Sequence, residues 1–368
     1  MLNTELSRQR QRRLLGVMQR RNLDAVVVGL PHHVYYFSAV RSHWLIESGF
    51  VLTSDGRAWL TSGNKPAENA AADESVAYDA QWFATLRQEQ PAVIAGQVMD
   101  VLRHRKAKRI GADASAITSQ VAIAFDGHVE PIDPDLWQMR RRKDADELEL
   151  MKTAIRASEA MYARAKEIVK PGVEETHVFT ELHEAAVKST GEPMSAPLGN
   201  DYVCGAGGGP PRKGRQAKDG EIYVLDLGPS YRGYFADNCR AFAVNGKPTD
   251  EQMKAWAAIT ECLAMVERTA KPGVRCRDLH EAAAAFLTDR TGGKLPHHLG
   301  HGVGLQPHEY PHLNPNTGWD DVLVEGEIFT AEPGLYGPHI NGGIRIENDY
   351  LVTATGVTNL LNAPVELA

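Results

Sequence analysis

Residues 222–228 read IYVLDLG, an apolar run that one carboxylate, Asp226, interrupts. Short apolar runs with β-branched and aromatic residues, closed by a glycine, are typical of buried strands. A carboxylate inside such a strand costs several kcal/mol unless it has a partner. The run therefore predicts a core strand whose acid faces a cation.

Two further acids repeat this pattern, because Glu332 and Glu347 each follow a short apolar run. Asp237 lies eleven residues after Asp226 across a glycine-bounded turn, so a hairpin can aim both carboxylates at one point. Any one of these acids could be a core carboxylate paired with arginine or held by backbone. Together with His301 they form an oxygen-rich set that suits two Mn, Co, Fe or Zn ions sharing carboxylates and a bridging water.

Composition sets the broad class. The chain has 368 residues, of which 43% are hydrophobic and 24% charged, and a net charge of -7, so it is long enough for two globular domains. The mildly acidic balance argues against nucleic acid or an anionic membrane as a partner. No apolar segment is long enough to span a bilayer and no signal-peptide core is present, so we expect a cytoplasmic protein. The four cysteines show no C-x-x-C spacing and are expected to be reduced.

The N-terminal part, residues 1–138, alternates helical and strand patterns and predicts a small α/β domain. An Asp-Gly pair at Asp55 and Gly56 predicts a hairpin turn. The other expected elements are a helix at 6–20 and strands at 23–28 and 109–112. The basic cluster at 140–143 is expected to be a solvated face between the domains.

The second domain, residues 144–368, begins with a helix that Asp144 caps together with Glu147. The tetrapeptide KPGV occurs at 170–173 and again at 271–274, each time after a long helical pattern and before a shorter one. Strands bearing the acids and His301 follow both copies. This repetition predicts two similar halves packed around a shared site.

From residue 144 onward the chain resembles the creatinase/methionine-aminopeptidase superfamily, peptidase family M24, which has the pita-bread fold. The resemblance rests on Asp226 and Asp237, on the run 296–302 (PHHLGHG) leading to His308, and on the segments 330–334 and 342–349. Residues 31–36 (PHHVYY) resemble the noncatalytic domain of prolidases, Xaa-Pro aminopeptidases and creatinase. The implied fold class is α+β/α/β, with a pita-bread catalytic domain of pseudo-twofold halves after a smaller creatinase-like α/β domain.

The resemblance also implies roles for the ligands. Asp226 and Asp237 would bind one divalent metal ion, and His301 and Glu332 would complete the site of a second. Asp237 and Glu347 would bridge the two ions. Glu332 would also handle the proton of the attacking, metal-bridging hydroxide.

Three other residues are implied to meet the substrate. His308 would stabilise the carbonyl oxygen, while His297 and Arg345 would line the pocket of proline-specific members. His297 could instead make a structural hydrogen bond, and Arg345 could pair with a ligand carboxylate. The implied activity is hydrolysis of Xaa-Pro bonds in short proline-containing peptides or small amides, as a dipeptidase or aminopeptidase, by a homodimer.

One departure concerns the loop before the Asp226 strand, within residues 203–215. Family peptidases usually carry a histidine there, about seventeen residues before the first metal aspartate, and this loop has none. Its basic residues Arg212, Lys213 and Arg215 could meet a substrate carboxylate or could simply be solvated. Two alternatives follow: a hydrolase or lyase of a small non-peptide metabolite, similar to ectoine hydrolases or sulfonio-propionate lyases, and a non-catalytic binding protein on the same scaffold.

Overall fold

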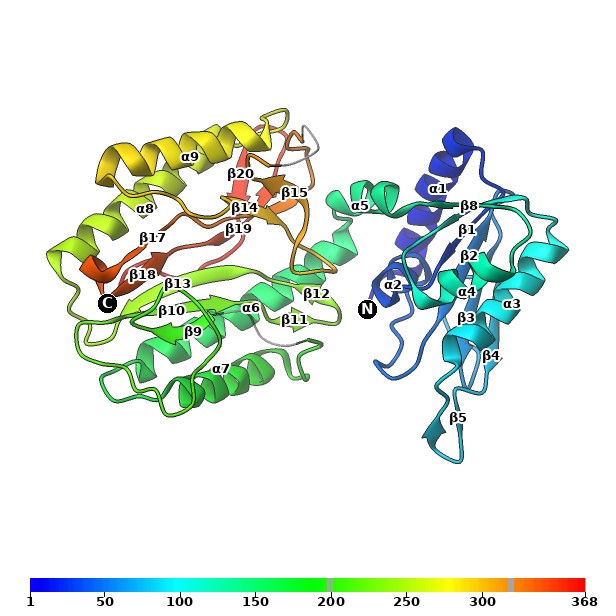
Figure 1. The fold of residues 1–368 in the computed structure, drawn as a ribbon, viewed down its shortest axis with the longest axis horizontal. Coiled ribbons are helices and arrows are strands. Elements are labelled where there is room, and N and C mark those ends of the chain that lie inside the picture. The colour runs from blue at the N-terminus through cyan, green and yellow to red at the C-terminus, as the bar shows by residue number, and fades with distance from the viewer. Residues whose placement is uncertain (197–198, 200, 317–320, 368) are drawn as a thin grey trace. The chain divides into compact units, whose positions relative to one another are not determined.

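The computed structural model describes residues 1–196, 199, 201–316 and 321–367. It divides into two compact units, Met1–Arg140 and Arg141–Ala368, each with its own sheets and core (Figure 1). The mixed α/β content expected from the sequence is confirmed. Within the described residues, no helix combines the length and apolar character that crossing a membrane requires.

The first unit is built on a six-stranded sheet in the order β4-β3-β2-β1-β7-β8. β1 pairs parallel with β7 and antiparallel with β2. Alternate residues of a strand face opposite sides of a sheet, and those of β1 that face α3 and α4 join the apolar core beneath them. The strands are β1 (Ala25–Val28), β2 (Gly49–Thr53), β3 (Ala58–Gly63), β4 (Glu74–Tyr78), β7 (Arg109–Ala112) and β8 (His128–Pro131).

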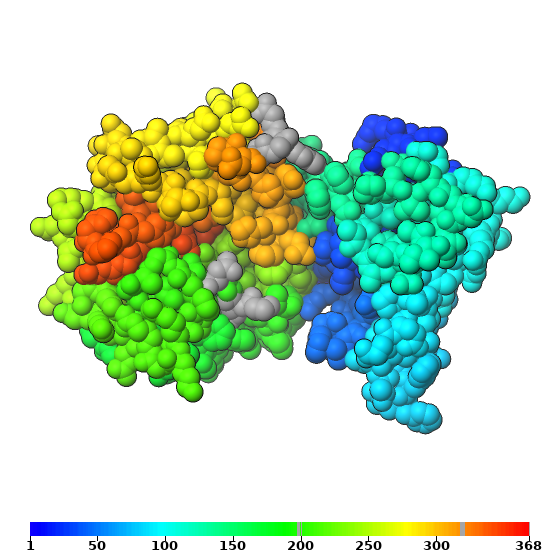
Figure 2. All heavy atoms as spheres, in the orientation of Figure 1, coloured from blue at the N-terminus to red at the C-terminus, as the bar shows by residue number. Residues whose placement is uncertain are grey.

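The helices of this unit are α1 (Thr4–Arg21), α2 (Pro31–Ser38), α3 (Gln90–His104), α4 (Ala116–Ala124) and α5 (Asp133–Arg141). The predicted turn between β2 and β3 is confirmed, with Gly56 at φ 85°, a value that glycine adopts without strain. A small hairpin of β5 (Gln81–Trp82) and β6 (Thr85–Leu86) projects from the unit (Figures 1 and 2). Its Trp82 and Phe83 side chains are exposed.

The second unit contains two helix pairs. α6 (Ala145–Ile168) begins with the predicted capping box of Asp144 and Glu147, and α8 (Asp250–Thr269) begins with one formed by Thr249 and Gln252. Each long helix is followed by a shorter one, α7 (Glu175–Thr190) and α9 (Cys276–Thr291). Figure 1 shows the two pairs on opposite sides of the strands.

The strands of this unit form a three-stranded sheet, β13-β10-β9, a five-stranded sheet, β15-β14-β16-β19-β20, and the pairs β11-β12 and β17-β18. Their bounds are β9 (Asp201–Cys204), β10 (Ile222–Leu227), β11 (Ser230–Tyr231), β12 (Tyr234–Phe235), β13 (Asn238–Ala243), β14 (Gly300–Gly302), β15 (Glu309–Leu313), β16 (Ile328–Ala331), β17 (Gly334–Gly337), β18 (Gly342–Arg345), β19 (Asn348–Val352) and β20 (Val357–Asn359), with a 3₁₀ helix η1 at Pro338–Ile340.

Strand β10 separates two apolar cores. Ile222 and Val224 pack into the core beneath α8 and α9, whereas Tyr223 and Leu225 pack into the core beneath α6 and α7. Asp226 shares the face of Ile222 and Val224, because side chains alternate along a strand. The carboxylate therefore points to the same side as one apolar core, at the end of the strand.

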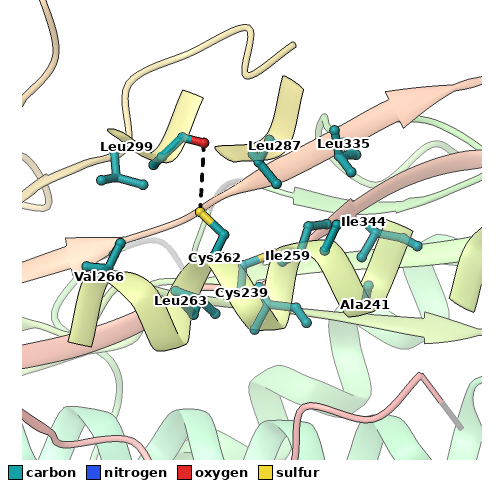
Figure 3. Close-up of a cluster of buried hydrophobic side chains, with 14 of the residues drawn as sticks. Cys239, Ala241, Ile259, Cys262, Leu263, Val266, Leu287, Leu299, Leu335 and Ile344 are labelled. Atoms are coloured by element: carbon teal, nitrogen blue, oxygen red, sulfur yellow. Dashed lines mark hydrogen bonds between the residues drawn. The ribbon is translucent and has the colours of Figure 1, made fainter. Parts of the chain in front are cut away.

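Figure 3 shows the core beneath α8 and α9, where Ile259, Leu263, Val266 and Leu287 lie around Cys262. The Cys262 thiol lies 4.0 Å from the carbonyl oxygen of Ala283. All four cysteines are free and buried. Cys239, Cys262 and Cys276 behave as small apolar side chains within these cores, whereas the thiol of Cys204 donates to the Glu175 carboxylate at 3.2 Å.

The basic cluster at 140–143 differs from the expectation of a solvated face. Arg141 is buried and pairs with Glu327 and, at 3.1 Å, with Asp321. The buried Lys143 lies 3.5 Å from Glu309. The prediction was wrong because the partner carboxylates are 166 to 186 positions away in the sequence, so a local charge run cannot reveal them.

Candidate metal centre

All of the sequence-predicted site residues line one cavity of about 200 Å³ in the second unit. One further side chain, His298, lines it as well. The lining residues are Asp226, Asp237, His297, His298, His301, His308, Glu332, Arg345 and Glu347. The cavity is therefore lined by side chains from both halves of this unit.

Backbone pairing explains how the acids meet. In the β10–β13 ladder Asp226 lies opposite Cys239. Cys239 in turn exchanges two backbone hydrogen bonds with Glu347, at 3.0 and 3.4 Å. The two carboxylates thus flank one residue of β13, and Asp237 comes directly before that strand.

Close strand packing places the histidine. Strand β14 holds His301 between Gly300 and Gly302, and it pairs with β15 and β16. A Cβ atom on Gly300 would lie 1.9 Å from the carbonyl oxygen of Thr330. Only glycine allows β14 to lie this near to β16, and Glu332 follows β16 directly.

Three acids form the first ligand group. Asp226, Asp237 and Glu347 each offer an oxygen, and these oxygens lie within 4.8 Å of one another. Burial raises the pKa of Asp226 to about 6, against the opposing charge of Arg345. Burial and the neighbouring carboxylates also raise the pKa values of Asp237 and Glu347.

Four carboxylate oxygens of this group make no hydrogen bond within the described part of the chain. Oδ1 of Asp226, Oδ2 of Asp237 and both carboxylate oxygens of Glu347 are buried without a hydrogen bond among the described residues. A buried, unpaired carboxylate is costly, and several sharing one cavity repel each other. The residues present therefore fit divalent cations, which satisfy such oxygens directly.

A second group contains the imidazoles. His301 Nε2 lies 3.6 Å from Oδ2 of Asp237 and 3.7 Å from Oε1 of Glu332. Burial lowers the pKa of His301 to about 3, so its ring is neutral and can offer a lone pair. Burial would raise the pKa of Glu332, but His298, His301 and Arg345 together hold it below its ordinary value.

His308 lies at the open side of this group. It directly precedes β15, is exposed, and its ring stacks on that of His301 with centroids 3.7 Å apart. Burial of part of the ring lowers the pKa of His308. The neutral imidazole can donate one hydrogen bond from a position at the rim of the site.

His297 and Arg345 are both engaged by the protein. The Nδ1 and Nε2 atoms of His297 lie 2.8 Å from the carbonyl oxygen of His298 and 2.7 Å from the hydroxyl of Tyr336. Arg345 donates to Oδ2 of Asp226 at 2.7 Å and to the Tyr336 hydroxyl at 3.2 Å. The geometry therefore favours the structural hydrogen bond for His297 and the carboxylate partner for Arg345.

Three contributors were not predicted from the sequence. Asp201 pairs with Arg345, Tyr336 joins His297 to Arg345, and His298 lies 3.1 Å from Glu332. Asp201 and Tyr336 lie in stretches without a metal motif, so no local signal marks them. His298 stands inside the quoted run PHHLGHG, where two adjacent histidines were the available signal.

The loop without a histidine folds back on the site. A Cβ atom on Gly207 would lie 2.8 Å from the Tyr336 ring, and one on Gly208 would lie 2.8 Å from the Asp201 carboxylate. Arg212 is held by the buried carboxylate of Glu175. Arg215 is likewise paired, with Glu221 at 2.5 Å. These pairs favour a structural role for both arginines over capture of a substrate carboxylate.

Two family models match the chain. The model described as metallopeptidase family M24 matches residues 149–354, and the model described as the creatinase/prolidase N-terminal domain matches residues 10–142. Curated relatives include the uncharacterized peptidase YqhT of Bacillus subtilis, 28% identical over 71% of this chain and 74% of that protein. The uncharacterized peptidase MW1651 of Staphylococcus aureus is 26% identical over 94% of this chain and 96% of that protein.

Solved structures share the fold over nearly the whole chain. An Xaa-Pro dipeptidase from Bacillus anthracis has a TM-score of 0.84 at 23% identity, covering 99% of both chains. A prolidase from Pyrococcus furiosus has a TM-score of 0.76 at 23% identity, covering 95% of this chain and 99% of that one. The two-domain architecture expected from the sequence, an N-terminal creatinase-type domain followed by the M24 catalytic domain, is thereby confirmed.

Proposed function

The chain belongs to metallopeptidase family M24, and from this premise we propose that it hydrolyses the Xaa-Pro bond of short peptides with two divalent metal ions. The observation that carries the proposal is the set of buried, unpartnered carboxylate oxygens that faces His301 across one cavity. The named prolidases and Xaa-Pro dipeptidases that share the fold support the choice of substrate.

The ligand assignment follows the two groups. Asp226 and Asp237 would hold one ion, His301 and Glu332 the other, and Asp237 and Glu347 would bridge them. When bound, a pair of divalent ions polarises the peptide carbonyl and lowers the pKa of water, so that a nucleophile is present near neutral pH.

The protein's own groups supply proton transfer and orientation. Glu332 keeps a low pKa, so its carboxylate is ionised and can accept the proton of the attacking water. His308, neutral and exposed at the rim, can donate a hydrogen bond to the carbonyl oxygen as negative charge develops on it. Both groups border the same cavity.

Arg345 and His297 act on the site indirectly in this proposal, through their contacts with neighbouring side chains. Arg345 compensates the buried charge of Asp226 and fixes its orientation. His297 has both ring nitrogens occupied, so we propose that it shapes the pocket with its ring surface and does not donate to substrate. A cavity of about 200 Å³ has room for a small residue such as proline.

A second candidate function rests on the loop before β10. Position 209, seventeen residues before Asp226, is a glycine where family peptidases usually carry a histidine. Loss of that group would suit a hydrolase or lyase of a small non-peptide metabolite. The non-catalytic alternative has no observation in its favour, because the predicted ligands all line one cavity.

The experiment compares substrates on one metal-loaded preparation. Protein reconstituted separately with Mn²⁺, Co²⁺ and Zn²⁺ should cleave Xaa-Pro dipeptides or tripeptides and leave matched Xaa-Ala peptides intact. Inertness toward the whole peptide panel with two ions bound would reject the peptidase and direct the search to metabolites. The homodimer and the cytoplasmic location stay predictions.

A further inference from the structure

His298 is the one side chain lining the cavity to which the proposed mechanism gives no role. It precedes β14, on which His301 lies three residues later, so both rings reach the same region. The ring centroids of His298 and His301 are 5.3 Å apart. The Nδ1 atom of His298 is buried and makes no hydrogen bond within the described part of the chain.

The Nδ1 atom of His298 lies beside a predicted metal ligand, the Glu332 carboxylate. Nδ1 of His298 is 3.1 Å from Oε1 of Glu332, and Nε2 of His301 is 3.7 Å from the same oxygen. Ligand atoms of His298, His301 and Glu332 all lie within 4.8 Å of one another. The Oε1 atom of Glu332 therefore has two imidazole nitrogens as close neighbours, one from His298 and one from His301.

These distances can be compared with the separation between two ligand atoms that bind the same metal ion. Two ligand atoms that each lie about 2.1 Å from a metal are about 3.0 Å apart at right angles and about 3.4 Å apart in a tetrahedron. The distance from His298 to Glu332 matches the first value, and the distances around His301 exceed the second by only a few tenths of an ångström. Little movement is needed for all three side chains to reach one ion.

We propose that His298 is an additional ligand of the second metal ion, which would then be held by two imidazoles. This inference rests on the dinuclear centre of the proposed function. Imidazole nitrogen suits Co, Zn and Fe, whereas Mn prefers oxygen. His298 thus biases the second site toward the nitrogen-preferring metals.

A hydrogen bond from His298 to Glu332 is the competing role, and two substitutions separate them. His298→Asn places an amide near the position of Nδ1, so it can still donate to Glu332, but a neutral amide is a poor ligand for these metals. His298→Ala removes both possibilities. His128→Ala is the matched control, because His128 is exposed on β8 in the first unit.

Metal-free protein is titrated with Co²⁺ and with Mn²⁺. Isothermal titration calorimetry measures the binding of both ions, and visible absorption also follows the binding of Co²⁺. The wild type and His128→Ala should bind two ions. Both His298 variants should lose about tenfold or more in Co²⁺ affinity at one site, lose less for Mn²⁺, and show an altered Co²⁺ spectrum. Circular dichroism of the metal-free proteins checks that the variants fold.

Three results would overturn the inference. Unchanged Co²⁺ affinity and spectrum in both variants would show that His298 binds no metal. Recovery of both in His298→Asn would show that it acts only through a hydrogen bond. A wild type that binds no metal would remove the proposed function as well, whereas two bound ions with unaffected variants would remove this inference alone.

Discussion

Nη2 of Arg345 lies 2.7 Å from Oδ2 of Asp226, although 119 positions separate the two residues in the sequence. The same guanidinium also pairs with Asp201. Arginine presents several donors in a fixed plane and can hold two carboxylates at once, which a lysine ammonium cannot do with the same geometry. The pair therefore sets the direction in which Asp226 points into the site.

Arg345→Lys keeps the positive charge but loses this geometry. We expect kcat/KM on an Xaa-Pro peptide to fall by about 10- to 100-fold, because partners of metal ligands typically matter to this extent. Steady-state kinetics measure the effect. Arg164→Lys, at a half-buried pair with Glu181 that does not line the cavity, is the control and should leave the kinetics unchanged. Equal kinetics for both variants would contradict the role of Arg345.

The His308→Ala substitution should lower kcat without weakening metal binding. Removing one donor to a developing oxyanion typically costs about 10²- to 10³-fold in kcat. Metal content, measured by plasma emission on the dialysed protein, should stay at the wild-type value. A variant that loses metal would instead make His308 a ligand, and a kcat within threefold of wild type would remove it from the mechanism.

Stability of the metal-free protein should depend on pH through the buried acids. Burial raises the pKa of Asp226 to about 6 from an ordinary value of 3.8, and raises those of Asp237 and Glu347 as well. The folded state therefore binds protons more tightly than the unfolded chain. The resulting stability is fully present below about pH 4 and is lost as the pH rises through 6.

Thermal melting curves recorded between pH 5 and pH 8 test whether the stability of the metal-free protein falls as the pH rises. The melting temperature of the metal-free protein should fall by several degrees relative to that of Asp237→Asn, which carries one buried charge fewer. Saturating metal should remove the fall in the melting temperature of the wild type by neutralising the carboxylates. Parallel curves for wild type and variant across this range would show that Asp237 does not titrate in the folded state.

The sequence predicts the elements well where the signal is local. The helix that begins after Asp144 and the turn at Gly56 are found as expected, because capping and turn geometry depend on neighbouring residues. The ligand set also converges in one cavity, since a carboxylate in an apolar run is a strong signal. Partners that are distant in the sequence are different: Arg141, Asp201 and Tyr336 pair with residues that no local pattern encodes.

Gly300→Ala should destabilise the catalytic unit. Its added Cβ would meet a backbone oxygen 1.9 Å away, and backbone cannot rotate aside as a side chain can. The expected cost is about 3 kcal/mol, or a fall of several degrees in melting temperature. Gly356→Ala is the matched control, because nothing lies within 4 Å of its Cβ position. Equal melting temperatures would mean that β14 and β16 are not held this close.

The proposed function requires two metal ions between the acids and His301. Crystals grown with Mn²⁺ and measured at the manganese absorption edge should show two anomalous peaks, one beside Asp226 and one beside His301, with Asp237 and Glu347 between them. A map without peaks in this cavity, from crystals that contain manganese, would contradict it.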